Sequence, residues 1–193
     1  MNAAFAPIPA TAAPSAVEAI KGAMAKYPKG LVGRHVKRIE VVGRMHLFGV
    51  AASGTYAQEA LVISFSDRGK GLNFREAKRA FHHEFSSVLY QRHQASFPRE
   101  EWLRNNPPGF VYKGSSYNAV LLKATNVARE RQYFRQGFVC QYSQASLEDD
   151  FNMTMEFAMA GDLDPEEMKR YPHLSAKVAL ALQFVRQIEG KTP

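Results

Sequence analysis

The longest stripe of apolar positions lies in the middle of the chain and has helical spacing. Its members recur every three or four residues: Phe74, Ala77, Phe81, Phe85 and Val88. This period predicts one helix from residue 74 to about residue 93, with the stripe facing a core. Asn73 stands directly before the stripe and Glu76 follows three positions later, a variant of the capping box that predicts where the helix begins.

Shorter patterns predict further helices on both sides of this one. Helical spacing after Ser15 predicts a first helix that ends near Gly30. Acidic residues from Glu148 onwards suit the first turn of a helix, and Pro165 after an aspartate marks another helix start. A last amphipathic helix is predicted over residues 174–189.

Strand patterns are confined to the first third of the chain. Residues 60–66 form a short, continuous run of β-branched and aromatic residues, followed by a turn over 67–72, which is typical of a strand. Two further strands are predicted over 36–42 and 46–50. Together the patterns predict an α+β fold, in which a small, mostly antiparallel sheet packs on the long helix and a mainly helical C-terminal half follows.

The length and composition are those of one ordinary globular domain. The chain has 193 residues, of which 46% are hydrophobic and 22% charged, and nothing demands two domains. Residues 1–14 are rich in Ala and Pro and almost uncharged, so we expect a disordered lead that makes a poor signal peptide, with a single domain over 15–193. No apolar run reaches the ~18 residues of a membrane span.

Charge and cysteine content narrow the possible functions only slightly. The formal net charge of +7 fits either an anionic partner or a merely basic protein, because Lys and Arg are spread along the chain. Neither an aromatic RNA-binding signature nor a zinc-finger spacing is present, so no nucleic-acid motif supports such a partner. The single cysteine, Cys140, excludes an internal disulfide, and its apolar neighbours predict a buried thiol.

Two histidines and a carboxylate stand in consecutive positions midway along the long helix: His82, His83 and Glu84. The pair His83-Glu84 is the first half of H-E-x-x-H, in which an imidazole binds zinc and the next carboxylate acts as general base. The second half is missing, because Ser87 stands four positions after His83. The alternative is a helix whose polar face carries these groups without any such chemistry.

Other histidines fit the pattern less well. At about 100° per residue, Ser87 shares the helix face of His83, whereas His82 points away from it. His93 mimics the third histidine of a longer metalloprotease pattern, but on an unbroken helix it would stand ~15 Å from His83. A serine hydroxyl is also a poor zinc ligand beside an imidazole.

Carboxylates for a metal site are available further along the chain. Glu148, Asp149 and Asp150 follow one another at a predicted helix start. Acidic residues in a first turn also stabilise a helix without any function, because they interact favourably with its dipole. The cluster alone therefore leaves both interpretations open.

Two stretches resemble bacterial zinc-binding metallopeptidases related to the gluzincin proteases. The segment FHHEFSSVL over residues 81–89 is similar to their active-site helix. The segment GFVCQYS over 137–143, followed by EDDFN over 148–152, resembles the part in which such proteins place a tyrosine shortly before a glutamate-led helix. The order of sheet, metal helix, linker and acidic helix also agrees.

The resemblance implies a minimal zincin-like domain with Zn²⁺ as its cofactor. In that family's pattern His83 and Glu148 take the metal-ligand roles, Glu84 is the general base and Tyr142 an oxyanion donor. Ser87 departs from the second histidine of the pattern, which makes this an HExxH variant. Either another residue completes the site, or the metal is bound weakly, or the chain is a catalytically silent relative. The possible additional ligands are His82, Ser87, Asp149 and His93.

We therefore expect a zinc-dependent metallopeptidase-like hydrolase that acts on peptide bonds through metal-activated water, or a catalytically inactive relative of one. An exposed edge of the sheet would hold an extended peptide or protein substrate by strand addition. The alternative is a binding module without chemistry, whose basic surface contacts an anionic partner. Such a charge-driven binder would ignore chelators and weaken steeply with salt.

Overall fold

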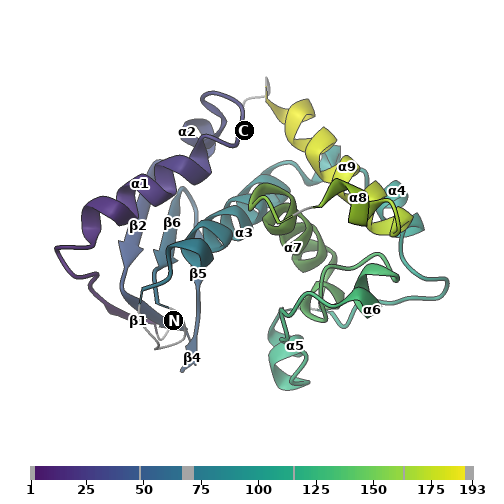
Figure 1. Ribbon diagram of the computed structural model, residues 1–193, viewed down its shortest axis with the longest axis horizontal. Coiled ribbons are helices and arrows are strands. Elements are labelled where there is room, and N and C mark those ends of the chain that lie inside the picture. The colour runs from purple at the N-terminus through teal and green to yellow at the C-terminus, as the bar shows by residue number, and fades with distance from the viewer. Residues whose placement is uncertain (1–2, 48, 67–71, 115, 163, 190–193) are drawn as a thin grey trace. The chain divides into compact units, whose positions relative to one another are not determined.

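The computed structural model (Figure 1) describes residues 3–47, 49–66, 72–114, 116–162 and 164–189. The chain divides into two compact units, of which unit 1 comprises Met1–Leu89 with Thr192–Pro193 and unit 2 comprises Tyr90–Lys191. The single domain over 15–193 stays a prediction, and the boundary between the two units falls inside the longest helix. A continuous apolar stripe cannot reveal such a boundary, because it looks the same on both sides.

Unit 1 contains the strands that the structure describes. In chain order its elements are β1 (Ala3–Ala6), α1 (Ala13–Met24), α2 (Leu31–His35), β2 (Arg38–Val42), β3 (Arg44–Leu47), β4 (Val50–Ala51), β5 (Gly54–Ala57), β6 (Ala60–Ser64) and most of α3 (Phe74–Arg92). The strands form two three-stranded sheets, ordered β1-β3-β4 and β2-β6-β5.

The strand pairing is mostly antiparallel, as predicted, but the strands form two small sheets where the sequence predicts one. The pairs β1–β3, β3–β4 and β5–β6 are antiparallel. The pair β2–β6 is parallel, with Arg38 opposite Ala60 and Val42 opposite Ser64. Figure 1 shows α3 beside the β2-β6-β5 sheet, which brings the helix that carries the histidines close to β5.

Helix α3 places its apolar stripe in the core of unit 1, as its period predicts. Phe81 and Phe85 have no exposed surface, and their rings stack with centroids 5.8 Å apart. The ring of Tyr27 meets both edge-on, at centroid distances of 6.2 and 4.7 Å. Leu61 and Ile63 of β6 are also fully buried. This aromatic contact fixes which face of α3 points inward.

Two helices begin at the capping residues that the sequence predicts. The Asn73 side-chain oxygen accepts hydrogen bonds from the amides of Arg75 and Glu76, both at 3.1 Å. Asp164 accepts one from the amide of Glu166 at 3.0 Å, at the start of a later helix. These contacts satisfy backbone donors that the first helical turn leaves unpaired.

The N-terminal lead and one strand differ from the prediction. Residues 1–14 are predicted to be disordered, yet β1 pairs with β3, with Phe5 opposite Met45, and α1 already begins at Ala13. Strand β5 was not predicted at all. Alanine- and glycine-containing segments show little alternation, so neither strand has the period that would reveal it. The predicted turn over 67–72 lies outside the described residues except for Leu72.

The secondary-structure elements that the structure describes in unit 2 are helices joined by loops. After η1 (Gln94–Ser96) its elements are α4 (Arg99–Arg104), α5 (Ser116–Leu121), α6 (Arg131–Phe134), η2 (Tyr142–Gln144), α7 (Leu147–Met159), α8 (Pro165–Met168) and α9 (Pro172–Ile188). Its core is aromatic: Phe97 contacts Trp102, Phe151 and Phe184 with each pair of ring centroids 5.3 Å apart. Among the described helices of the chain, none combines the length and apolar character needed to cross a membrane.

Candidate functional site

Two polar side chains of helix α3 are accessible within an otherwise buried stretch. Over residues 80–90 every residue is buried except His83 and Glu84, which are half-buried. With the aromatic stripe inward, His83 faces away from the core, and Glu84 stands on a neighbouring face of the helix. The His-Glu pair singled out by the sequence is therefore the accessible polar part of this segment.

The side chain of Glu84 lies directly against strand β5. A Cβ atom on Gly54 would stand 2.5 Å from Glu84 Cγ and 2.8 Å from its Oε1, so only a glycine leaves the space that this carboxylate occupies. Real Cβ atoms essentially never approach another atom so closely. The carboxylate assigned the role of general base is thus held at a sheet strand.

His82 faces the core of unit 1. Only 2% of its surface is exposed, and its Nδ1 lies 3.1 Å from the hydroxyl oxygen of Tyr27. Its ring also lies 5.6 Å from that of Phe81, centroid to centroid. Burial raises the pKa of the Tyr27 hydroxyl, which keeps it protonated and able to donate to the imidazole. These contacts account for His82 as a structural residue of the core.

Ser87 lies one turn beyond His83, and 3% of its surface is exposed. Its neighbour Ser86 donates a hydrogen bond from its hydroxyl to the carbonyl of His83 at 2.7 Å. Small hydroxyl side chains therefore occupy the turn in which the full motif would carry a second imidazole.

The acidic cluster lies in the first turn of α7, in unit 2. Asp149 and Ser146 cap each other: the Asp149 amide donates to Ser146 Oγ at 3.0 Å, and that hydroxyl donates to Asp149 Oδ2 at 2.6 Å. This reciprocal cap accounts for Asp149 without any metal. Glu148 is half-buried and accepts a hydrogen bond from the side-chain amide of Gln91. Glu148 is thus the more accessible of the two candidate ligands.

The remaining predicted site residues also belong to unit 2. Tyr142 is half-buried against a hydrophobic cluster that contains Cys140, and its amide donates to the carbonyl of Asn126 at 3.1 Å. His93 follows the last residue of α3 and is buried, with 8% of its surface exposed. Cys140 is fully buried, and burial raises the pKa of its thiol to about 11. The prediction of a buried cysteine is confirmed.

A buried ion pair in unit 2 has no counterpart in the sequence prediction. Asp150 and Lys177 are both fully buried, with Lys177 Nζ 2.7 Å from Asp150 Oδ2. The same oxygen accepts hydrogen bonds from Trp102 Nε1 at 2.9 Å and from the Tyr112 hydroxyl at 2.7 Å. Burial raises the pKa of Asp150 and lowers that of Lys177, and the attraction between them opposes both shifts. Lys177 looks like any helix lysine in the sequence, so its burial could not be predicted.

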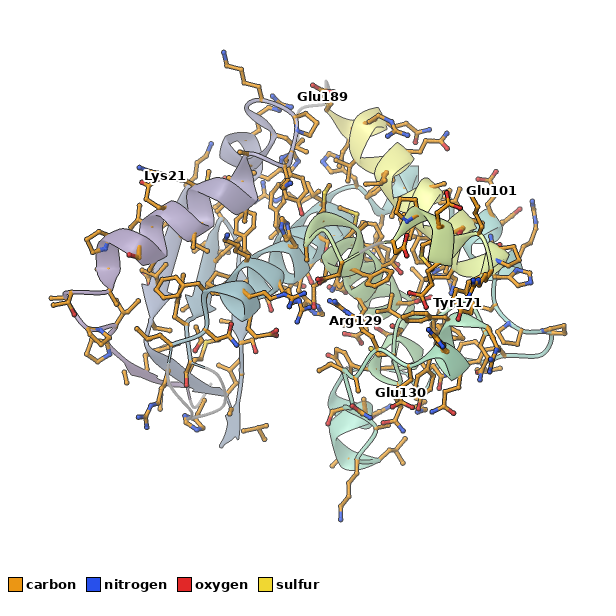
Figure 2. The ribbon with its side chains drawn as sticks, viewed as in Figure 1. Lys21, Glu101, Arg129, Glu130, Tyr171 and Glu189 are labelled. Carbon is orange, nitrogen blue, oxygen red and sulfur yellow. The ribbon has the colours of Figure 1, made fainter. Side chains whose placement is uncertain are left out.

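A second charged cluster in unit 2 includes another carboxylate of α7, that of Glu156. Arg129, labelled in Figure 2, pairs with Asp162 and, at 3.4 Å, with Glu156. Its guanidinium carbon also lies 5.1 Å from the ring centroid of Phe157. Glu156 is therefore engaged in an arginine cluster.

The last question at this site is which side chains could bind a zinc ion. Among the described residues, no group of three or more His, Cys, Asp or Glu side chains is arranged to hold a metal ion. Unit 1 supplies His83 and Glu84 with Ser87 in place of the second imidazole, and Glu148 belongs to unit 2. A hydrolytic zinc site uses three protein ligands, and the motif in unit 1 supplies one imidazole and one carboxylate.

Comparison with known proteins adds no further assignment, since no protein-family model, curated protein or solved structure matches the chain.

Proposed function

We propose that this chain is a metallopeptidase-like protein that binds extended peptides in unit 1, where His83 and Glu84 reach the surface. The observation that carries the proposal is that these two side chains alone are accessible over residues 80–90, with the Glu84 carboxylate against β5. In zinc peptidases an imidazole and the following carboxylate on one helix form the reacting centre. The sheet strand beside the Glu84 carboxylate adds a surface on which a peptide can lie.

Strand β5 has the geometry that strand addition requires. Among the strands that the structure describes it has one neighbour, β6. The amide of Ser64 donates to the carbonyl of Ser53, which marks these two residues as a hydrogen-bonded pair. Such pairs alternate along an antiparallel ladder, so the amide and carbonyl of Gly54, opposite Ile63, point away from β6. A peptide backbone can pair with them there.

We propose binding without efficient hydrolysis, because Ser87 stands where the full motif has its second histidine. His83 would offer its imidazole nitrogens, and Glu84 a carboxylate that accepts hydrogen bonds from peptide amides. The replacement of the second histidine by Ser87 removes a strong metal ligand and leaves these other features of the helix unchanged.

A second candidate, an anionic partner, is favoured by the distribution of charge between the units. Unit 1 carries 12 Lys and Arg against 6 Asp and Glu, whereas unit 2 carries 13 against 12. The excess of positive charge thus resides almost wholly in the unit with the proposed site. This candidate and the first are compatible if the bound peptide is acidic.

To test this proposal, a library of short random-sequence peptides is passed over the immobilised full chain. The affinity of each retained peptide is then measured. We expect His83→Ala and Glu84→Gln to weaken binding by about tenfold or more, the effect of losing one good hydrogen bond to a charged group. His46→Ala is the matched control, because His46 is exposed on β3. A library from which nothing is retained, or site variants that bind like the wild type, would contradict the proposal. Chelator-sensitive cleavage of captured peptides would instead show an active metallopeptidase.

A further inference from the structure

Gly54 stands at the start of β5, where a glycine has no conformational reason to be. Six other glycines of the described chain have a positive φ angle, but Gly54 does not. Any residue could therefore adopt its backbone conformation. Glycine also weakens a strand relative to residues with a side chain. The cause must therefore be the space around its Cα.

That space is filled by the side chain of Glu84. A Cβ on Gly54 would overlap Glu84 Cγ at 2.5 Å, Oε1 at 2.8 Å and Cδ at 3.0 Å. The overlap reaches Cγ, close to the backbone of α3, so a small movement of the carboxylate alone does not relieve it. The whole side chain of Glu84 would have to rotate away from the strand.

We propose that Gly54 is a positioning residue, whose missing side chain sets the carboxylate of Glu84 beside the outward amide and carbonyl of β5. This inference rests on the proposed function, since it places Glu84 next to the peptide that β5 binds. Gly54 then has two roles. Its backbone pairs with the bound peptide, and its lack of a Cβ leaves the space in which Glu84 lies beside that peptide.

The experiment is a double-mutant cycle on the full chain, using a peptide captured from the library. Gly54→Ala is expected to weaken peptide binding at least tenfold while the protein remains folded by circular dichroism. In a Glu84→Ala background, which removes the overlapping atoms, Gly54→Ala is expected to have no further effect. Gly33→Ala is the matched control in unit 1, because a Cβ there meets no atom within 4 Å.

A second readout needs no peptide: carbodiimide labelling of the Glu84 carboxylate, located by mass spectrometry. We expect the labelling of Glu84 to change in Gly54→Ala and to stay as in the wild type in Gly33→Ala. Unchanged labelling in Gly54→Ala overturns the inference, as does an equal loss of peptide affinity with and without the Glu84 side chain. A wild type that binds no peptide overturns the proposed function, and the labelling still decides whether Gly54 positions Glu84.

Discussion

At the scale of residues, three side chains of α3 can be compared with the zinc-peptidase motif H-E-x-x-H. His83 and Glu84 retain the types, spacing and accessibility that the motif requires. Ser87, one turn later, does not, because its hydroxyl is a weak ligand and 3% of its surface is exposed. In the proposed function, this one position on α3 separates a hydrolase from a peptide-binding protein.

Replacing Ser87 by histidine tests that position. Ser87→His restores the full H-E-x-x-H spacing, and we expect zinc affinity to rise by an order of magnitude or more. The gain must vanish in the double variant that also carries His83→Ala, since both imidazoles would hold the same ion. Titration with a zinc-sensitive dye measures both affinities, and circular dichroism verifies that each variant is folded. A gain that survives the loss of His83 would place the zinc elsewhere.

Lys177 makes a comparable prediction for stability in unit 2. Lys177→Met leaves the Asp150 carboxylate buried without its cation, and we expect a loss of about 3–5 kcal/mol in the free energy of unfolding. Lys169→Met is the matched control: Lys169 pairs with Glu166, and both side chains are mostly exposed. Such surface pairs contribute about 0–1 kcal/mol. Chemical denaturation compares the two variants, and equal losses would mean that Lys177 is not buried as described.

At the scale of elements, the sequence predicts what periodic patterns and caps can encode. The inward face of α3 and the caps at Asn73 and Asp164 follow directly from residue types at fixed spacing. Strand β5 could not be predicted, because its Ala- and Gly-containing segment shows little alternation. Its contact with Glu84, 30 positions after Gly54, has no local signal either. The burial of Lys177 is likewise a tertiary effect with no local signal.

The packing of α3 gives a prediction at this scale. Phe85→Ala removes a ring that is fully buried and contacts Tyr27 and Phe81, so we expect a cost of about 3–5 kcal/mol in unfolding free energy. Phe5→Ala is the matched control, because Phe5 is 51% exposed, and its cost should be much smaller. Urea denaturation gives both values. Similar costs for the two variants would contradict the described orientation of α3.

At the scale of the whole molecule, the two units differ in charge more than in size. Unit 1, which carries the proposed site, has twice as many basic as acidic residues, and unit 2 is nearly balanced. Lys and Arg do occur along the whole chain, as the sequence shows. Their excess over Asp and Glu becomes local only once the boundary near residue 89 is known.

This asymmetry predicts a preference among peptides. An acidic peptide should bind more tightly than a basic peptide with the same apolar residues, and the difference should shrink as salt screens the charges over about 10 Å or less. Fluorescence anisotropy at low and high salt measures the effect, with an uncharged peptide as the control. Equal affinities for both peptides at low salt would show that the charge of unit 1 does not act at the site.

The central claim is that an extended peptide binds along β5 beside His83 and Glu84. Amide hydrogen exchange of the full chain, measured with and without a captured peptide, tests it most directly. We expect slower exchange in the segment that contains Gly54, because its outward amide gains a hydrogen-bond partner in the complex. The same peptide at equal concentration should cause less protection in Glu84→Ala, because it binds that variant more weakly. Saturating peptide that leaves exchange over β5 unchanged, or that protects only unit 2, would contradict the account.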